Sequence, residues 1–379
     1  MLNSPIRILH FIGSLDIGGS QAMVMNIYRK IDRQKIQFDF IIDHENGTFF
    51  KNEIESLGGK VYFFPNMNGK NIFKVLKFWN NFFIKHNEYK VIHFHVRSYT
   101  SLLIPIVKKN GLFTIVHSHS TSNGNGLFSL IKYFLQLPLR FQGDYFLACS
   151  DEAGRWLFGD NVLRKKNYKT IPNAIDGKKF YFDIDKRNEV RKKLDINDEC
   201  FVLGNIGRMT YSKNQMFLVE LLYEIKKTHS NVKLLLVGDG ETYNSIREKV
   251  IDMKLENEVI MIGNSSTPEL FYHAMDVFVF PSFWEGLGIV TIEAQANGLK
   301  CVVSDKIPKS IDIGSNLISY LSLNSSKITW IEKIFSNPPK RINQEEKLKQ
   351  SGFEIENNII WIEKFYIKNH EKFLNGEHI

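Results

Sequence analysis

Cysteine is scarce in this sequence, which has only Cys149, Cys200 and Cys301 among its 379 residues. An odd number of cysteines scattered through apolar stretches does not make a disulfide framework, and it is typical of buried thiols in a reducing compartment. The first residues lack the long apolar region of a signal peptide, and no apolar run approaches the ~18 residues that span a bilayer. We therefore expect a cytoplasmic protein, either soluble or peripheral to a membrane.

Acidic residues are scarce in the first half of the chain. Residues 1–180 contain 24 Lys and Arg against 13 Asp and Glu, residues 181–379 contain 25 against 28, and the whole chain has a net charge of +8. The basic excess of the first half favours an anionic partner there, such as membrane headgroups, a lipid phosphate or nucleic acid. An ordinary solvated basic surface would have the same composition.

Short apolar runs with strand character alternate with stretches of helical period. The first series runs from IRILHFI (6–12) to DYFLAC (144–149), and the second from FVLGNIG (201–207) to CVVS (301–304). This alternation predicts βαβ units, with parallel sheets that carry helices on both faces. A chain of this length, with 43% hydrophobic residues, can bury two such cores.

The predicted organisation is therefore two doubly wound, Rossmann-like α/β domains at residues 1–180 and 181–353. Residues 172–190 contain Pro, Asn-Ala and Asp-Gly without clear periodicity, which indicates a linker. The last segment, 354–379, begins with an amphipathic pattern that predicts one helix from Glu354 to about Lys372.

Glycines follow the first strand-like run. Open parallel sheets bind ligands at the carboxyl ends of their strands, so the loops directly after strands are the candidate site. Gly18 and Gly19 precede a predicted helix, where backbone N–H groups can approach a phosphate or a sugar oxygen closely. A structural turn needs the same residues. No GxGxxG follows a strand, which speaks against a nicotinamide-dependent oxidoreductase.

Two cations lie in the loop that begins at Gly207, after the first strand of the second domain. Arg208 offers a bidentate fork and Lys213 a mobile point charge. Together they would neutralise the charge that grows on a departing nucleoside diphosphate. In an isolated loop, the same two residues would be solvated surface charges.

Two glutamates are separated by seven residues in PSFWEGLGIVTIEAQANG (281–298). Glu285 lies in a glycine-rich loop and Glu293 about one turn inside the following helix, so both carboxylates can lie near the N-terminus of that helix. Carboxylates there can accept hydrogen bonds from vicinal hydroxyls, while the N–H groups of the loop bind anionic oxygens.

Histidines invite a metal interpretation, because His93, His95, His117 and His119 end two strand-like runs. No nearby Cys or acidic residue completes a recognisable set of ligands. Asp183 and Asp185 form a DxD, a motif that can bind a metal ion, but they fall in the predicted linker. We expect no metal site.

In their types and their order along the chain, these motifs resemble those of the large family of retaining GT-B glycosyltransferases called glycosyltransferase family 4. The resemblance covers nearly the whole chain. Its most specific element is the E-x7-E signature, Glu285 to Glu293, supported by Gly18-Gly19, His119, the loop from Gly207 to Lys213, and Gly238-Asp-Gly-Glu241. The segments LACSDEAGRWLFG and IPNAID resemble members that build bacterial exopolysaccharide or capsule.

The resemblance implies a role for each residue of the site. Glu293 would bind the donor ribose and Glu285 the hydroxyls of the donor sugar, while Arg208 and Lys213 would bind the diphosphate. His119 would approach the transferred sugar from the first domain. The other donor contacts would come from Gly18, Gly19, Gly207, Gly286, Leu287, Gly288 and Ile289. The chain departs from many members after Asp305, where Lys306-Ile307-Pro308-Lys309 replaces a glycine pair.

The implied reaction moves a sugar from a nucleoside-diphosphate sugar, most often a UDP-sugar in this family, to a glycan or lipid-linked acceptor in bacterial surface polysaccharide synthesis. Its site would lie in a cleft between the two domains, with the C-terminal helix returning to the first. No cofactor is required, because the two cations and a helix N-terminus supply positive potential. Nucleic acid is not expected as a partner. The alternatives are a nucleotide-sugar epimerase of the same architecture and a non-catalytic nucleotide-sugar-binding partner subunit.

A basic stripe suggests membrane contact. Lys70, Lys74, Lys77 and Lys85 fall at helical spacing opposite Ile72, Val75, Leu76, Trp79 and Phe83. With the basic first half, this pattern favours reversible docking at the anionic inner face of the plasma membrane. A surface helix packed on a sheet has the same pattern.

Overall fold

The computed structural model describes residues 4–16, 18–44, 47–68, 70–97, 99–119, 127–336 and 340–374, with only the backbone for 127–130. The chain forms two compact units, Met1–Ala174 with Ile355–Ile379, and Ile175–Glu354. The sequence predicted the boundary between the first and second domains later in the chain, after residue 180. The division comes earlier because Ile175 and Phe180 pack in the core of the second unit.

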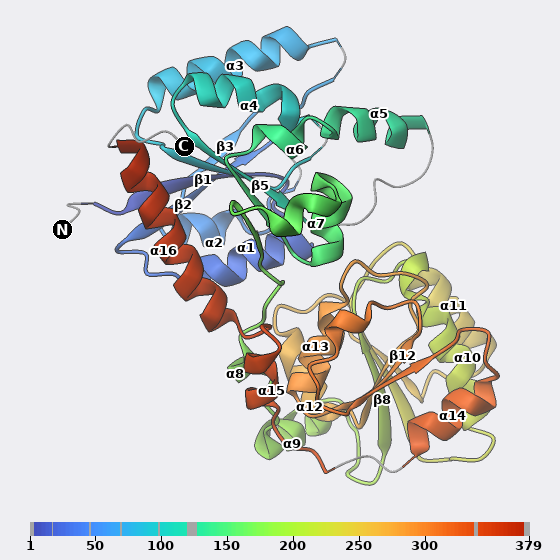
Figure 1. The fold of residues 1–379 in the computed structure, drawn as a ribbon. Helices are drawn as coiled ribbons and strands as arrows, with labels where there is room; N and C mark the ends of the chain where they lie inside the picture. Colours follow the sequence, from blue (N-terminus) through green and yellow to red (C-terminus); the bar gives the residue numbers. More distant parts are fainter. Residues whose placement is uncertain are drawn as a thin grey trace. The chain divides into compact units, whose positions relative to one another are not determined.

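The first unit contains a seven-stranded parallel sheet with the order β3-β2-β1-β4-β5-β6-β7. Figure 1 shows this sheet between α3 and α4 on one side and α1, α2 and α16 on the other. Reversal of the order at β1 and β4 is the doubly wound arrangement expected from the sequence. The strands are β1 (Ile6–Gly13), β2 (Ile36–Ile42), β3 (Val61–Phe63), β4 (Val91–Phe94), β5 (Phe113–Ser118), β6 (Tyr145–Ala148) and β7 (Tyr168–Thr170).

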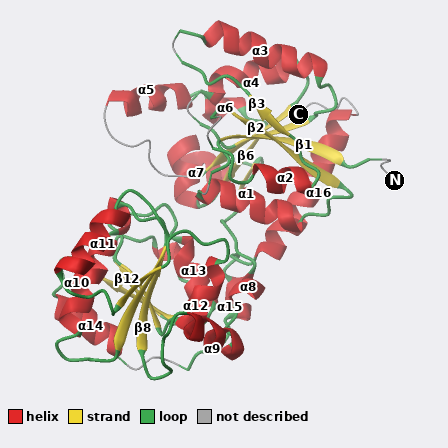
Figure 2. Ribbon diagram, turned by 180° about the vertical axis from the view of Figure 1, so that it is seen from behind, coloured by secondary structure: helices red, strands yellow, loops and turns green. Residues whose placement is uncertain are grey.

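Helices cover both faces of this sheet (Figure 2). They are α1 (Gly19–Lys30), α2 (Lys51–Ser56), α3 (Ile72–Lys85), α4 (Thr100–Lys109), α5 (Leu127–Gln136), α6 (Leu139–Gln142), α7 (Asp151–Phe158), the 3₁₀ helix η1 (Asp160–Arg164) and the C-terminal α16 (Ile355–Leu374).

The second unit repeats the same topology with six parallel strands in the order β10-β9-β8-β11-β12-β13. Its strands are β8 (Phe201–Ile206), β9 (Val232–Val237), β10 (Val259–Met261), β11 (Val277–Phe280), β12 (Lys300–Ser304) and β13 (Ile318–Leu321). Its helices are α8 (Gly177–Phe180), α9 (Ile184–Lys193), α10 (Gln215–Ile225), α11 (Tyr243–Asp252), α12 (Phe271–Ala274), α13 (Ile289–Ala296), α14 (Lys327–Phe335), α15 (Glu345–Gln350) and the 3₁₀ helices η2 (Tyr211–Lys213), η3 (Pro268–Leu270) and η4 (Lys309–Ile311).

Each sheet is buried on both faces, as parallel sheets are. All seven residues of β2 and every residue of β4, β5, β11 and β12 are buried. Alternate residues of one strand serve different cores: Ile8 packs under α1 and α16, whereas its neighbour Leu9 packs under α3 and α4. The apolar runs of the sequence therefore become the central layer of each unit.

The C-terminal helix α16 belongs to the first unit (Figure 1). Its residues Ile359, Ile362 and Tyr366 are buried in the same core as Ile8 and Phe38. This apolar face stabilises the helix on the sheet and realises the return to the first domain that the resemblance implied.

The predicted linker at 172–190 contains helix α8 and most of helix α9. Asp183 is the N-cap of α9, and its carboxylate accepts hydrogen bonds from the N–H groups of Asp185 and Lys186 at 2.9 and 3.3 Å. The DxD of the sequence thus has a structural role as a helix cap. None of the helices within the described ranges is both long and apolar enough to cross a membrane.

Candidate active site

The loops after β8, β9 and β11 meet at the carboxyl edge of the second sheet. Gly207 donates its N–H to Val237 O at 2.9 Å, and Met209 donates to Asp239 O at 2.9 Å. A Cβ atom at Gly238 would lie 2.1 Å from Gly207 O, so only glycine lets the two loops approach this closely. These contacts fix the loop that carries Arg208 and Lys213.

A second set of contacts ties the loop of Lys213 to the loop after β11. Phe283 donates its N–H to Ser212 O at 2.8 Å, and the side-chain amide of Asn214 donates to Pro281 O at 3.1 Å. Asn214 has a φ of 56°, a left-handed conformation that asparagine tolerates, and it begins α10. The two loops therefore form one rigid edge.

Lys213 and Glu285 meet across that edge. The ammonium nitrogen Nζ lies 2.6 Å from both carboxylate oxygens of Glu285, and the side chains are 23% and 8% exposed. Lys213 also lies over the ring of Phe280, 5.2 Å from its centroid. The sequence assigned these two residues to different parts of the donor, whereas the structure pairs them.

Arg208 is exposed at the same edge. Its backbone carbonyl accepts a hydrogen bond from Gln215 Nε2 at 3.2 Å, which holds the loop against α10. Within the described part of the chain, its guanidinium group makes no hydrogen bond and no ion pair. Arg208 is therefore a cation of this edge whose charge no carboxylate among the described residues compensates.

The N-terminus of α13 presents backbone donors. Gly288 caps the helix in a left-handed conformation (φ 85°), which suits glycine. Among the described residues, no acceptor is bound by the backbone N–H groups of the stretch from Gly286 to Ile289. Unsatisfied N–H groups and the helix dipole make such a terminus attractive to anions. Ile307, from the loop that departs from the family pattern, packs against Gly288.

Glu293 lies in the second turn of α13. Its Oε2 accepts a hydrogen bond from the hydroxyl of Tyr272 at 2.6 Å, while part of its surface stays accessible. Burial raises the pKa of Glu293 to about 7, although the hydrogen bond from Tyr272 acts in the opposite direction. The carboxyl group is thus balanced between its two protonation states near neutral pH. Tyr272 was missed from the sequence because nothing marks a tyrosine five residues before β11 as a partner of this glutamate.

Gly18, Gly19 and His119 belong to the first unit. Gly18 is the extended N-cap of α1, and His119 directly follows β5 and lies 2.8 Å from His95 through Nε2 and Nδ1. His10, which the sequence did not single out, completes the group with His93 and His117.

The histidines also bear on the metal question. Ring nitrogens of His10, His93 and His95, and of His95, His117 and His119, lie within 4.8 Å of one another. The pKa of each of the five imidazoles is lowered by burial. Neutral imidazoles are metal ligands in general, so the expectation that the chain has no metal site stays a prediction.

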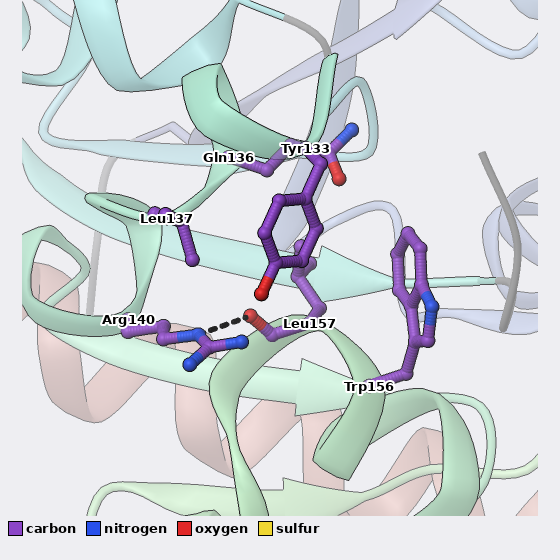
Figure 3. A pocket seen from close by; sticks show the side chains of 6 residues that line it. All are labelled: Tyr133, Gln136, Leu137, Arg140, Trp156 and Leu157. Carbon is purple, nitrogen blue, oxygen red and sulfur yellow. Dashed lines mark hydrogen bonds between the residues drawn. The ribbon is translucent and has the colours of Figure 1, made fainter. Parts of the chain in front are cut away.

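Two cavities contain none of the predicted site residues. One of about 10 Å³, the size of one water, lies between α5, α6 and α7, where Arg140 Nε donates to Leu157 O at 3.3 Å beside Tyr133 and Trp156 (Figure 3). The other, of about 260 Å³, lies beside α9 and is lined by Lys186, Glu189, Val190, Lys193, Leu194, Ile262, Thr267, Leu270 and Phe271.

Comparison with known proteins identifies the family. The model described as Glycosyltransferase Family 4 matches residues 17–179, and the model described as Glycosyl transferases group 1 matches residues 186–317. The putative glycosyltransferase EpsF of Bacillus subtilis (strain 168) is 30% identical over 367 residues, which cover 95% of this chain and 96% of that protein. The chain belongs to glycosyltransferase family 4.

Further relatives of this glycosyltransferase are consistent with that assignment. The capsular polysaccharide biosynthesis glycosyltransferase CapM of Staphylococcus aureus is 35% identical over 188 residues, 48% of either chain. The crystal structure of Anabaena Alr3699/HepE in complex with UDP and glucose has a TM-score of 0.72 at 17% identity and covers 97% of this chain and 100% of that one. The chain is therefore a transferase with the two-domain GT-B fold, as the sequence predicted.

Proposed function

We propose that this glycosyltransferase moves a sugar from a nucleoside-diphosphate sugar, with uridine as the nucleoside, to a glycan or lipid-linked acceptor in bacterial surface polysaccharide synthesis. The contact of Lys213 with Glu285, beside the open N-terminus of α13, carries the proposal. One edge there offers cations and N–H donors to a diphosphate and carboxylates to hydroxyls. HepE was crystallised with UDP and glucose, and CapM is named for capsular polysaccharide, which supports the donor and the product class.

The diphosphate is assigned to the positive groups of the edge. Arg208, whose charge is uncompensated, and the N–H groups from Gly286 to Ile289 bind its oxygens. Lys213 lies next to them but shares its charge with Glu285. We expect Lys213 to act most strongly when the charge on the leaving diphosphate grows.

The hydroxyl groups of the donor are assigned to the carboxylates. Glu293 accepts hydrogen bonds from the ribose, with Tyr272 holding one of its oxygens. Glu285 binds the hydroxyls of the sugar. Gly18, Gly19 and His119 of the first unit stay predicted contacts of the donor.

In the proposed reaction the bond between the anomeric carbon and the diphosphate oxygen breaks and the diphosphate leaves with the electron pair. A bond from an acceptor hydroxyl oxygen forms on the same face as that hydroxyl loses its proton. Retention of configuration follows from attack on that face. Stabilisation of the leaving charge is the main task of the site, and the protein cations supply it without a metal ion. We assign no catalytic base.

Helix α3 supports a proposed contact with an anionic membrane. Its lysines Lys74, Lys77 and Lys85 and the preceding Lys70 are exposed, while Val75, Trp79 and Phe83 are buried against the sheet. The structure adds exposed apolar side chains between the lysines, because Phe73 is 87% and Ile84 64% exposed. Cations interspersed with apolar groups suit the headgroup region. A lipid-linked acceptor would be presented at such a surface.

The function is tested with purified protein, a panel of sugar nucleotides and lipid-linked acceptors. We expect uridine diphosphate to be released from one donor only when an acceptor is present, and the product to keep the anomeric configuration of the donor. Conversion of the donor to an isomer without an acceptor would instead support the epimerase. Binding without turnover of any donor would contradict the proposed function.

A further inference from the structure

The five histidines of the first unit form hydrogen-bonded rows across three neighbouring strands. His10, His93, His95 and His117 are at most 8% exposed, and His119 is partly exposed at the end of β5. Burial lowers the pKa of His10 and of His119 to about 3. At neutral pH each ring is therefore uncharged, with one N–H donor and one lone pair.

One row runs from His10 through His95 to His119. His10 Nδ1 lies 3.0 Å from His95 Nε2, and His95 Nδ1 lies 2.8 Å from His119 Nε2. Because His95 uses both nitrogens, one must donate and the other accept. The direction of the first hydrogen bond therefore fixes that of the second, and the tautomer of His119 is coupled to His10.

The two ends of the row differ in their surroundings. Neither His10 Nε2 nor His119 Nδ1 has a hydrogen-bonding partner among the described residues. The ring of His10 lies 4.2 Å from that of Phe38 and 5.5 Å from that of Phe40, between centroids. The imidazole of His10 is tilted by 46° to the ring of Phe38 and nearly parallel, at 24°, to that of Phe40. An aromatic face attracts an N–H group and an aromatic edge attracts a lone pair, so this end of the row accommodates either tautomer of His10.

At the other end, the positive charge of Arg97 acts on His119 and lowers its pKa further. A cation nearby favours a lone pair on the outer nitrogen over an N–H group. Together with the hydrogen-bonded row, the charge of Arg97 therefore favours the arrangement in which His119 donates to His95 and His95 donates to His10.

We infer that His10 and His95 are positioning residues that hold His119 in the tautomer with its proton on Nε2, so that Nδ1 accepts a hydrogen bond from a hydroxyl of the transferred sugar. The role of Nδ1 rests on the proposed function, whereas the tautomer does not. Without these hydrogen bonds, His119 could adopt either tautomer. One of the two would present an N–H group to the sugar hydroxyl.

A second row provides a matched control. The hydroxyl of Tyr366 lies 2.7 Å from His93 Nδ1, and His93 Nε2 lies 3.1 Å from His117 Nδ1. No hydrogen bond within the described residues links this row to His119. Tyr366→Phe thus removes a buried hydroxyl of the same region while it keeps the ring that packs edge-on against His10, so the hydrogen bonds of the first row stay in place.

The tautomers are read by NMR of metal-free protein labelled with ¹⁵N in the histidine rings, with each ring assigned by single substitution. We expect a pyrrole-type Nε2 and a pyridine-type Nδ1 for His119. In His10→Phe, His95 loses its acceptor, so the second tautomer of His119 should appear. In Tyr366→Phe the His119 signals should keep their types.

A proton on Nδ1 of His119, or on both nitrogens, would overturn the inference, as would a His10→Phe spectrum in which His119 is unchanged. Joint shifts of three rings at one equivalent of zinc would show a metal site in place of the row. The parent spectrum decides the tautomer even where His10→Phe does not fold. The NMR measurement needs no turnover. A protein that transfers no sugar would therefore contradict the proposed function but not the inferred tautomer of His119.

Discussion

The affinity of this glycosyltransferase for uridine diphosphate should depend on pH through Glu293. Its carboxyl has a pKa of about 7 in the free protein because burial disfavours the charge. About nine-tenths of it is protonated at pH 6 and about one-tenth at pH 8. Ribose hydroxyls donate most strongly to the ionised form. Binding therefore releases a proton, and the affinity should rise with pH until the carboxyl is ionised.

The magnitude follows from the contact and from the ionised fraction. Hydrogen bonds to a charged group contribute about 1.5–3 kcal/mol, or roughly 10- to 150-fold in Kd. Glu293→Gln keeps the shape and one acceptor oxygen but removes the charge. At pH 8 the variant should bind uridine diphosphate more weakly by about that factor. At pH 6 the difference should shrink by roughly tenfold, because most of the parent is protonated there.

The assay is isothermal titration calorimetry of both proteins at pH 6, 7 and 8. The phosphates of the ligand titrate alike for both, so the ratio of the two Kd values isolates Glu293. Tyr272→Phe removes the hydrogen bond that lowers the pKa of Glu293. This second variant should move the rise in affinity to higher pH. A ratio that stays constant from pH 6 to 8 would refute the reasoning.

Further predictions concern the other residues of the site and the membrane. Glu285→Gln should lower kcat by ~10²-fold or more while uridine diphosphate binds no more weakly in calorimetry, since its proposed partner is the sugar. Arg208→Ala should lower kcat by ~10²-fold, whereas Arg247→Ala on α11 of the same unit should not change it. Turnover should persist in EDTA, and loss of activity that manganese restores would contradict the proposed role of the protein cations. In vesicle sedimentation, Lys74→Glu with Lys77→Glu should reduce binding to anionic lipid, whereas the matched pair Lys192→Glu with Lys347→Glu should not.

Much of the fold could be predicted from the sequence because the central strands are buried on both faces and read as continuous apolar runs. The strands missed were β7 and β13, which lie at the edges of their sheets. Residues of both are partly exposed, and β7 is only YKT. Edge strands are short and mixed in polarity, so neither run stands out from a loop.

Helix α9 was taken as linker for a related reason. Its sequence, IDKRNEVRKK, buries only Val190 and Arg191. Arg191 is held by backbone carbonyls of Ala274, Asn197 and Cys200 at 2.5–2.9 Å. Hydrogen bonds of Arg191, and not an apolar stripe, therefore anchor this helix. The helical spacing of apolar residues, on which the prediction relied, is absent from it.

The candidate site was predictable in its residue types but not in its pairings. Glu285 and Glu293 stand out because their spacing and the surrounding glycines are unusual. The contact of Lys213 with Glu285 joins residues 72 positions apart, and it depends on two loops that are brought together by Asn214 and Phe283. Tyr272 and His10 lie inside apolar segments. Nothing in the sequence indicates that the hydroxyl of Tyr272 contacts Glu293, or that the ring of His10 contacts His95.

The pairing of Lys213 with Glu285 bears on how the site distributes its charge. In the free protein this pair is nearly neutral, Glu293 is half protonated near pH 7, and Arg208 is a cation that no carboxylate among the described residues compensates. A donor whose sugar hydroxyls bind Glu285 would weaken the hold of that carboxylate on Lys213. The ammonium charge would then be released toward the diphosphate at the step where the leaving charge grows. Since only interactions that strengthen in the transition state accelerate the reaction, a lysine restrained by Glu285 in the free protein is better suited to catalysis than one that binds the diphosphate fully from the start.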